Sequence, residues 1–247
     1  EEKFLEFRKQ FPFFIFEKQE YGITSAGIDI RFSFNLAGQY KFHPTLFIPR
    51  KSFFLPDHLI TGQLDNIVFN IGMIELISYW KAACPPAIVI RPFTLHPDQI
   101  AWWKKLYFNG LGEFFYLNSI PATEENFVDL RVETDYGVPR SKMPSNMTDA
   151  LIIPVGGGKD SVVTLELLGN RPGSIPLIMN PRGASFETIV TKGFLPDDFI
   201  EIRRTIDPLL LQLNDRGFLN GHTPFSALLA FVTVLASMLS GRRHIAL

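Results

Sequence analysis

The sequence predicts an α/β protein in which an α+β domain precedes a domain built on a parallel sheet. Residues 11–49 alternate apolar and polar side chains with a period of two, which is typical of an antiparallel β meander with one packed face. Residues 150–247 alternate short β-branched runs with helical patterns, which is typical of a parallel sheet. A stretch without periodicity separates these patterns, so we expect domains at 1–145 and 146–247.

Composition restricts the class of function. The 247 residues have a net charge of −1, which argues against a basic surface, and we expect no nucleic-acid partner. The single cysteine, Cys84, excludes a disulfide within the chain; we expect a small buried residue rather than a reactive thiol. No signal peptide is visible, and serines interrupt the uncharged run 223–241, so we expect a cytoplasmic protein without a membrane span. The pattern predicts no particular oligomeric state.

The meander is centred on a strand predicted at Gly27–Leu36. Its apolar residues, from Ile28 to Leu36, occupy one face, and its polar residues, from Asp29 to Asn35, occupy a solvated face. His43 falls on the polar face of a neighbouring strand, where we expect solvation rather than catalysis. The other elements expected in this domain are strands at 13–16, 40–43, 45–48 and 87–90, a helix within 57–83, and an aromatic-rich helix or helix pair at 98–117 interrupted at Gly110 and Gly112, followed by a connection at 121–149.

The second domain alternates strands and helices. The expected strands are 151–155, 175–180, 199–206 and 243–247, and the expected helices are 161–169, 184–192 and 225–239. Thr223 is the expected N-cap of the last helix and Pro224 its first residue. Right-handed crossovers make such strands parallel and place a ligand at their carboxyl ends. Because the last strand stops with the chain, we expect this domain to be truncated at its C-terminal end.

Residues Ala150–Ser161 have the features of a phosphate-binding loop. A β-branched strand is followed by three glycines and then by a helix. Glycine permits a close approach of the ligand, and the first N–H groups of a helix have no intrahelical partner, so an anion is favoured there. The Walker A pattern fails because Ile153 and Asp160 stand at two of its required positions, and the Rossmann pattern fails because Ser161 stands at its third glycine.

This stretch resembles the PP-loop of the ATP pyrophosphatase superfamily, whose pattern is S-G-G-x-D-S. Gly156 replaces the first serine, whereas Gly157, Gly158, Asp160 and Ser161 match. The resemblance implies a parallel-sheet domain, similar to the adenine nucleotide alpha hydrolases, that binds ATP and Mg²⁺ and cleaves ATP between the α- and β-phosphates. It also implies adenylation of a carboxylate or a carbonyl-type oxygen. A single cysteine argues against the sulfur-transferring members, which generally use cysteine pairs.

Three features together resemble the ATP-dependent muramyl-peptide glutamate epimerases. They are the GGGKDS form of the loop, a β-rich first domain of about 145 residues, and the stretch Asn220–Ala227. The resemblance implies inversion of the terminal L-Glu of UDP-N-acetylmuramoyl-L-alanyl-L-glutamate through an acyl-adenylate, with release of AMP and diphosphate, for peptidoglycan precursor synthesis. The expected partner is this nucleotide-sugar peptide. The family continues beyond this point with a further polar segment.

The resemblance assigns roles to the loop residues. Backbone N–H groups of Gly156–Gly158 and Ser161, together with the serine hydroxyl, are expected to hold the departing diphosphate. Lys159 adds charge and is a catalytic candidate, although a solvated loop lysine is the alternative. Asp160 is expected to ligate magnesium, directly or through water, and can also cap the helix. The residues expected at the nucleotide are Val155, Gly156, Gly157, Gly158, Lys159, Asp160, Ser161, Asn180 and Arg182.

Proton transfer requires groups on opposite faces of the glutamate α-carbon. His222 is the favoured candidate because it lies at a helix start on the expected ligand edge, and a histidine suits proton transfer near neutral pH; a structural histidine is the alternative. Asp207, at the end of a strand, is a second candidate. Arg182 and Arg203 are candidates to hold the carboxylate or diphosphate of the substrate.

Three functions therefore compete. The first is the epimerase. The second is another PP-loop ligase or amidotransferase, in which a nucleophile rather than a base meets the acyl-adenylate. The third is a nucleotide-binding module without turnover, which the glycine in place of the usual first serine would suit.

Overall fold

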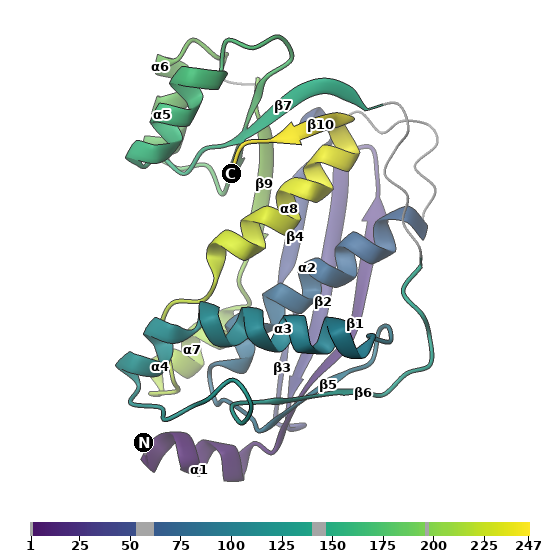
Figure 1. The fold of residues 1–247 in the computed structure, drawn as a ribbon, viewed down its shortest axis with the longest axis vertical. Helices are drawn as coiled ribbons and strands as arrows, with labels where there is room; N and C mark the ends of the chain where they lie inside the picture. The colour runs from purple at the N-terminus through teal and green to yellow at the C-terminus, as the bar shows by residue number, and fades with distance from the viewer. Residues whose placement is uncertain (1, 53–61, 140–146, 196–197) are drawn as a thin grey trace.

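The computed structural model describes residues 2–52, 62–139, 147–195 and 198–247. Within these ranges the strands form one ten-stranded sheet in the order β10-β7-β8-β9-β4-β2-β1-β5-β6, with β3 paired to β2 (Figure 1). The strands are β1 Phe13–Ile23, β2 Gly27–Leu36, β3 Tyr40–Phe42, β4 Thr45–Pro49, β5 Ala87–Ile90, β6 Asp129–Val132, β7 Thr148–Pro154, β8 Ile175–Met179, β9 Ile200–Thr205 and β10 Arg242–Ile245. The helices are α1 Glu2–Gln10, α2 Gly62–Trp80, α3 Pro97–Gly110, α4 Gly112–Leu117, α5 Lys159–Leu168, α6 Gly183–Thr191, α7 Pro208–Asp215 and α8 Phe225–Ser240, with a 3-10 turn at Arg50–Ser52.

The predicted meander is confirmed, because β2 pairs antiparallel with β1, β3 and β4. The apolar residues of β2 that were assigned to the packed face are fully buried. The polar face is less exposed to solvent than predicted, since Ser33 and Asn35 are also buried. Asn35 donates to Glu17 at 2.7 Å, and the Ser33 hydroxyl lies 3.2 Å from Nδ1 of His43, which is itself exposed as expected.

The parallel sheet predicted for the second half of the chain is also observed. Strands β10, β7, β8 and β9 pair in parallel in that order. This parallel sheet continues into the meander, because β9 pairs antiparallel with β4 at Thr45–Thr205 and Phe47–Arg203. The two sequence-predicted domains therefore share one sheet, and the boundary near residue 145 stays a prediction.

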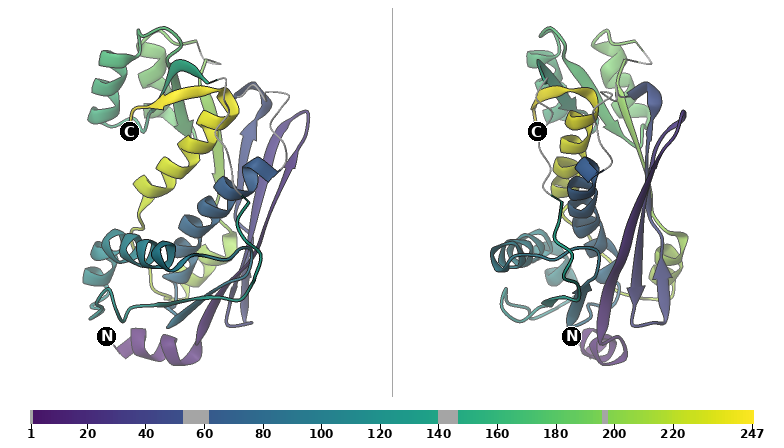
Figure 2. Two further views of the ribbon diagram at one scale, coloured as in Figure 1. Left: turned by 45° about the vertical axis from the view of Figure 1, so that its right-hand side comes forward. Right: turned by 90° about the vertical axis from the view of Figure 1, so that its right-hand side faces the viewer.

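Helix α2 is the central buried helix. It packs on β1 and β2, and α8 packs against it on the same side of the sheet (Figure 2). Gly72 weakens the helical pattern in sequence, and the packing explains why glycine stands there. A Cβ at this position would lie 2.4 Å from the Phe16 ring, so only glycine permits this approach of helix and sheet. The buried thiol of Cys84, just after α2, has a pKa raised by burial, in keeping with the predicted core role.

Several elements were not predicted. Helix α1 buries only Phe4 among its residues and is held by Arg8, which donates to the carbonyls of Cys84 and Phe127. Strand β6 forms inside the expected connection by pairing in parallel with β5. Helix α7 begins at Pro208. The N-cap of α8 is Pro224 rather than Thr223, so the predicted cap is wrong by one residue.

None of the described helices combines the length and the apolar character needed to cross a bilayer. The helix of the uncharged run, α8, packs instead against α2, β10 and β7. Its residues from Val232 to Leu239 are mostly buried, which agrees with the predicted buried helix.

Candidate functional site

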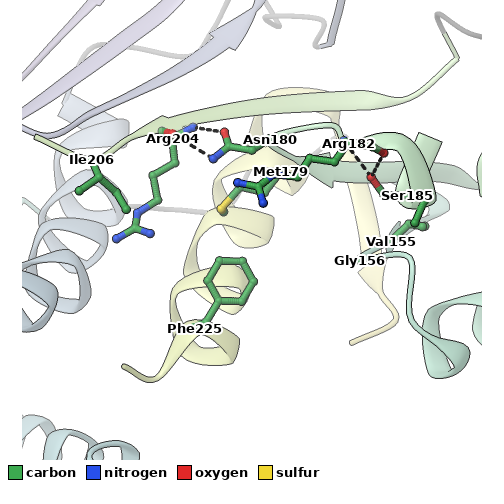
Figure 3. A pocket seen from close by; sticks show the side chains of 10 residues that line it. Val155, Gly156, Met179, Asn180, Arg182, Ser185, Arg204, Ile206 and Phe225 are labelled. Atoms are coloured by element: carbon green, nitrogen blue, oxygen red, sulfur yellow. Dashed lines mark hydrogen bonds between the residues drawn. The ribbon is translucent and has the colours of Figure 1, made fainter. Parts of the chain in front are cut away.

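A cavity of about 450 Å³ lies at the carboxyl ends of β7, β8 and β9, the edge at which a ligand was predicted (Figure 3). Four of the residues predicted at the nucleotide line it, namely Val155, Gly156, Asn180 and Arg182. The sequence did not single out the other lining residues, which include Met179, Arg204, Ile206 and Phe225. The remaining predicted loop residues, from Gly157 to Ser161, lie outside the cavity lining.

The glycine loop has a backbone that requires glycine at one position. Gly157 has a φ of +84°, and a Cβ there would lie 2.9 Å from the backbone nitrogen of Ser185. The loop is closed by Ser161, whose hydroxyl accepts from Gly157 N at 3.2 Å and donates to Gly158 O at 2.8 Å. Gly156 and Gly158 have open space where a Cβ would stand. The loop therefore packs tightly against α6 at Gly157 and is accessible on either side of it.

Lys159 and Asp160 begin α5 with Gly158 as the N-cap. Their side chains are 89% and 88% exposed, and they contact each other. Neither side chain bonds to any other part of the described structure, so both are available to a ligand. The N-cap of α5 is Gly158 rather than Asp160, and the Asp160 carboxylate contacts Lys159 instead of capping the helix.

Asn180 joins the ends of β8 and β9. Its Nδ2 donates to Arg204 O at 3.0 Å, and its Oδ1 accepts from Arg204 N at 2.7 Å. Its φ of +51° lies in the left-handed region, which asparagine tolerates better than most residues. Because both ends of the amide are bonded to backbone, Asn180 shapes the cavity wall.

Arg182 supplies an exposed cation at the cavity. It directly precedes α6, and the Ser185 hydroxyl caps the helix by accepting from Arg182 N at 3.3 Å and donating to Arg182 O at 2.9 Å. Across the residues that the structure describes, its guanidinium has neither an ion-pair nor a hydrogen-bond partner. An anion in the cavity would meet this free charge together with the start of α6.

Arg204 supplies a second guanidinium, and it is held by a buried carboxylate. Its Nε and Nη2 donate to both oxygens of Glu75 on α2 at 2.9–3.1 Å, and Nη2 also donates to Ser78 at 3.3 Å. Burial by itself would lower the pKa of Arg204. The charge and the hydrogen bonds of Glu75 more than offset this effect, so the pKa of Arg204 is raised. A charged residue inside the apolar pattern of α2 was the signal in the sequence for this pair.

Arg203, which the sequence suggested as an anion ligand, does not line the cavity. Successive residues of a strand point to opposite faces, so Arg203 and Arg204 diverge. Arg203 donates to Glu201 at 2.6 Å, and this hydrogen bond and charge raise the pKa of Arg203. Of the two neighbouring arginines, Arg204 is therefore the one that lines the cavity.

The structure places the two acid–base candidates away from the cavity lining. Asp207 caps α7, with its Oδ1 accepting from Leu209 N at 2.9 Å and its Oδ2 from His43 N at 2.6 Å. Both carboxylate oxygens are thus bonded to backbone. His222 is 82% exposed in its side chain, and its Nδ1 lies 2.8 Å from Oε1 of Glu113 on α4. The two residues form separate clusters.

A buried lysine supports the segment that carries His222. Lys81 is 7% exposed, and its Nζ donates to Asn220 Oδ1 at 3.0 Å and to the carbonyl of Gly221. Burial, and then the neighbouring charge of Arg204, lowers the pKa of Lys81 to about 8. Lys81 and Arg204 are therefore neighbouring cations, of which Arg204 lines the cavity.

Comparison with known proteins identifies the family. Residues 6–247 match the family described as the MurL N-terminal domain. A curated UDP-N-acetyl-alpha-D-muramoyl-L-alanyl-L-glutamate epimerase of Salinispora tropica is 33% identical over 208 residues, which are 83% of this chain and 43% of that protein. Proteins with the same name from a Micromonospora species and from Xanthomonas oryzae pv. oryzae are 31% and 30% identical, over 75% and 69% of this chain and 40% and 37% of theirs. No solved structure matches significantly.

The chain thus spans about two fifths of the length of the curated relatives that it matches. The family match covers nearly all of its residues, and the relatives agree in name. The names of these relatives agree with the resemblance to glutamate epimerases that the sequence indicated. The chain belongs to the MurL N-terminal domain family.

Proposed function

We propose that this chain takes part in the ATP-dependent epimerisation of the terminal L-Glu of UDP-N-acetylmuramoyl-L-alanyl-L-glutamate, a step in peptidoglycan precursor synthesis. The observation that carries the proposal is the similarity, over 69–83% of the chain, to proteins named for epimerisation of this substrate. The cavity beside the glycine loop supports a role for the chain in binding the reacting groups.

The reaction needs activation of the carboxylate before the proton can leave. Removing the α-proton beside an ionised carboxylate would place a second negative charge next to the first. In the proposed sequence the glutamate carboxylate attacks the α-phosphorus of ATP and diphosphate leaves, which gives an acyl-adenylate with a neutral, electron-withdrawing carbonyl. A base then takes the α-proton, an acid returns one from the opposite face, and water releases AMP with the inverted carboxylate.

The residues present fit ATP as the second substrate. The start of α5 offers first-turn N–H groups for the diphosphate, next to a loop in which a Cβ at Gly157 would clash. Arg182 and Arg204 add positive charge at the cavity wall. Phe225, which is 50% exposed, faces the same space from α8 and offers apolar surface to a base or a sugar (Figure 3).

Asp160 remains the proposed magnesium ligand. Mg²⁺ is usually held by one or two carboxylates together with substrate phosphates. In the described residues no group of three or more His, Cys, Asp or Glu side chains could hold a metal ion, and the single exposed carboxylate of Asp160 suits this shared arrangement. The ion would neutralise charge on the phosphates, and Lys159 would add to this charge compensation.

The structure supports a proton-transfer role for His222 better than for Asp207. His222 has an accessible ring at the segment that leads into α8, so we propose it as one of the two proton-transfer groups. Asp207 has both oxygens engaged by backbone N–H groups, and this arrangement supports a helix cap more directly than proton transfer. The second proton-transfer group is unassigned.

The test uses the full-length protein with ATP, Mg²⁺ and the UDP-linked L-alanyl-L-glutamate substrate in D₂O. The proposal expects AMP, together with deuterium at the α-carbon of a D-Glu residue. AMP without deuterium would contradict the epimerase and indicate a ligase or amidotransferase that lacks its co-substrate. The absence of AMP would indicate a nucleotide-binding module or a different acceptor.

A further inference from the structure

The segment that carries His222 is held in place by Lys81, directly after α2, and by Asn118, directly after α4. Lys81 donates to Asn220 Oδ1 at 3.0 Å and to the carbonyl of Gly221. Asn118, directly after α4, donates to the Asn220 carbonyl at 3.1 Å. The two bonds from Lys81 are part-buried and the bond from Asn118 is exposed. These side-chain hydrogen bonds hold the segment just before His222 in the absence of a ligand.

The same segment is joined to the cavity wall. The Thr223 hydroxyl lies 3.4 Å from the hydroxyl of Ser78, which in turn accepts from Arg204 Nη2 at 3.3 Å. Phe225 lines the cavity and follows His222 by three residues, a length of chain that spans at most about 11 Å. His222 is outside the cavity lining, but its Cα is no more than about 11 Å from that of Phe225, a distance that a long nucleotide-sugar peptide can span.

The imidazole of His222 is oriented by one carboxylate. Nδ1 of His222 lies 2.8 Å from Oε1 of Glu113, which is in the first turn of α4. A carboxylate accepts hydrogen bonds and cannot donate them when ionised, so Nδ1 carries the proton in this contact. Nε2 is then the ring nitrogen with a free lone pair. The chain before α8 descends to α4, which brings the two residues together (Figure 1).

We propose that Glu113 is a positioning residue that holds His222 in the tautomer with Nε2 free, for one of the two proton transfers at the glutamate α-carbon. The inference rests on the proposed function. When Nε2 takes the α-proton, the ring becomes an imidazolium and the Nδ1 proton stays shared with Glu113, whose charge then balances it. The bond broken is the α-carbon–hydrogen bond, and its electron pair passes into the activated carbonyl.

The test compares Glu113→Ala and Glu113→Gln with the wild type in the full-length protein. Glutamine can still accept from Nδ1 but has no charge, whereas alanine loses both functions. For Glu113→Ala we expect kcat for deuterium exchange to fall about 10- to 100-fold, less than the loss of a proton-transfer group itself, with KM little changed. The kcat of Glu113→Gln for deuterium exchange should lie between that of Glu113→Ala and that of the wild type. Diphosphate release in the first turnover should keep its wild-type rate, since adenylation precedes proton transfer.

A second readout does not depend on activity. The ¹⁵N chemical shifts of His222, assigned by their loss in His222→Asn, should show Nδ1 protonated in the wild type and in Glu113→Gln, and a mixture of tautomers in Glu113→Ala. Unchanged exchange kinetics and an unchanged tautomer in Glu113→Ala would overturn the inference. A wild type without diphosphate release would contradict the proposed function instead, and the tautomer would still decide the role of Glu113.

The chain supplies a matched control. His244 on β10 also contacts a carboxylate, Asp149, which lies near the amino end of β7 and so opposite to the cavity. Asp149→Asn removes the charge from a similar exposed pair and should leave both exchange and diphosphate release at wild-type rates. Exposed pairs contribute little to stability, so Glu113→Ala should also unfold at the wild-type temperature. A lowered unfolding temperature with normal tautomer would show a structural role and overturn the inference.

Discussion

The two walls of the cavity are built in different ways. The glycine-loop wall consists of Val155 and Gly156 together with the exposed Arg182, and the exposed side chains of Lys159 and Asp160 follow the loop outside the lining. The opposite wall depends on Arg204 and Glu75, which are 129 residues apart, with side chains 12% and 1% exposed. The first wall presents backbone and free charge to a ligand, and the second presents a charge whose position is fixed by a buried partner.

This difference separates binding from stability. A buried ion pair contributes little net stability, but removing one partner leaves an uncompensated charge and is costly. An exposed loop charge can be removed at almost no cost in folding. We therefore expect variants of Arg204 and Glu75 mainly to lower the free energy of unfolding. Variants of the exposed charges at the loop wall should mainly weaken ligand binding and leave the free energy of unfolding nearly unchanged.

The largest effect is expected for Glu75→Ala. It leaves Arg204 charged, buried and unpaired, so the free energy of unfolding should fall by about 3–5 kcal/mol. Urea denaturation measures this change. Glu133→Ala is the matched control, because Glu133 also pairs with an arginine, Arg91, at 3.1 Å, but with 51% and 44% of the two side chains exposed, and should cost less than about 1 kcal/mol. Equal losses in the free energy of unfolding for the two variants would contradict the view that the buried partner of Arg204 is needed for folding.

Gly157→Ala should have the next largest effect. A φ of +84° disfavours alanine, and its Cβ would lie 2.9 Å from Ser185 N, so we expect a loss of about 1–3 kcal/mol and a displaced loop. Gly158→Ala is the control, because its Cβ meets nothing within 4 Å and no positive φ is required. Unfolding by urea and first-turnover diphosphate release should both separate the two variants. Equal behaviour would contradict a tight contact between the loop and α6.

The same contrast explains what could be predicted from sequence. The glycine loop, the strands β2 and β5 and the helix pair α3–α4 follow from local periodicity and turn residues, and the structure has them where expected. Strand β6 was missed because its pairing with β5 is long-range, and its alternation of polar and apolar residues covers only the four positions 129–132. Helix α7 was missed because Asp207 was considered only as a strand-end carboxylate, whereas Asp-Pro is also a helix-start signal.

The candidate site divides in the same way. Four predicted residues line the cavity because the carboxyl ends of parallel strands meet at one edge. The pairing of Arg204 with Glu75 could not be derived from spacing, because the register of β9 on β4 decides which arginine faces α2. The contact of His222 with Glu113 depends on how the segment before α8 packs on α4, which no local pattern specifies.

Lys81 should make the stability of the protein depend on pH. Its pKa is about 8 in the folded protein against an ordinary value of 10.5, so between these pH values the unfolded chain binds more protons. The free energy of unfolding of the wild type, measured relative to Lys81→Met, should therefore rise with pH from about 8 to 10.5 and be level below that range. The difference between proteins removes the contribution of Tyr21 and Tyr79, whose pKa values are raised by burial. A difference that is flat across this window would contradict a lowered pKa of Lys81.

The smallest effect on folding is expected at the loop wall, for Arg182→Ala. The exposed guanidinium has no partner in the described part of the chain, so the free energy of unfolding should change by less than about 0.5 kcal/mol. Its loss should nevertheless weaken ATP binding about 10- to 150-fold, because a charge-assisted hydrogen bond to an anion contributes on the order of 1.5–3 kcal/mol. Arg131→Ala is the control, since Arg131 is an exposed arginine on β6, at the opposite end of the sheet from β7, and pairs with the equally exposed Asp129. Calorimetry of ATP binding should separate the two variants while urea denaturation does not, and equal affinities would show that Arg182 is not at the nucleotide.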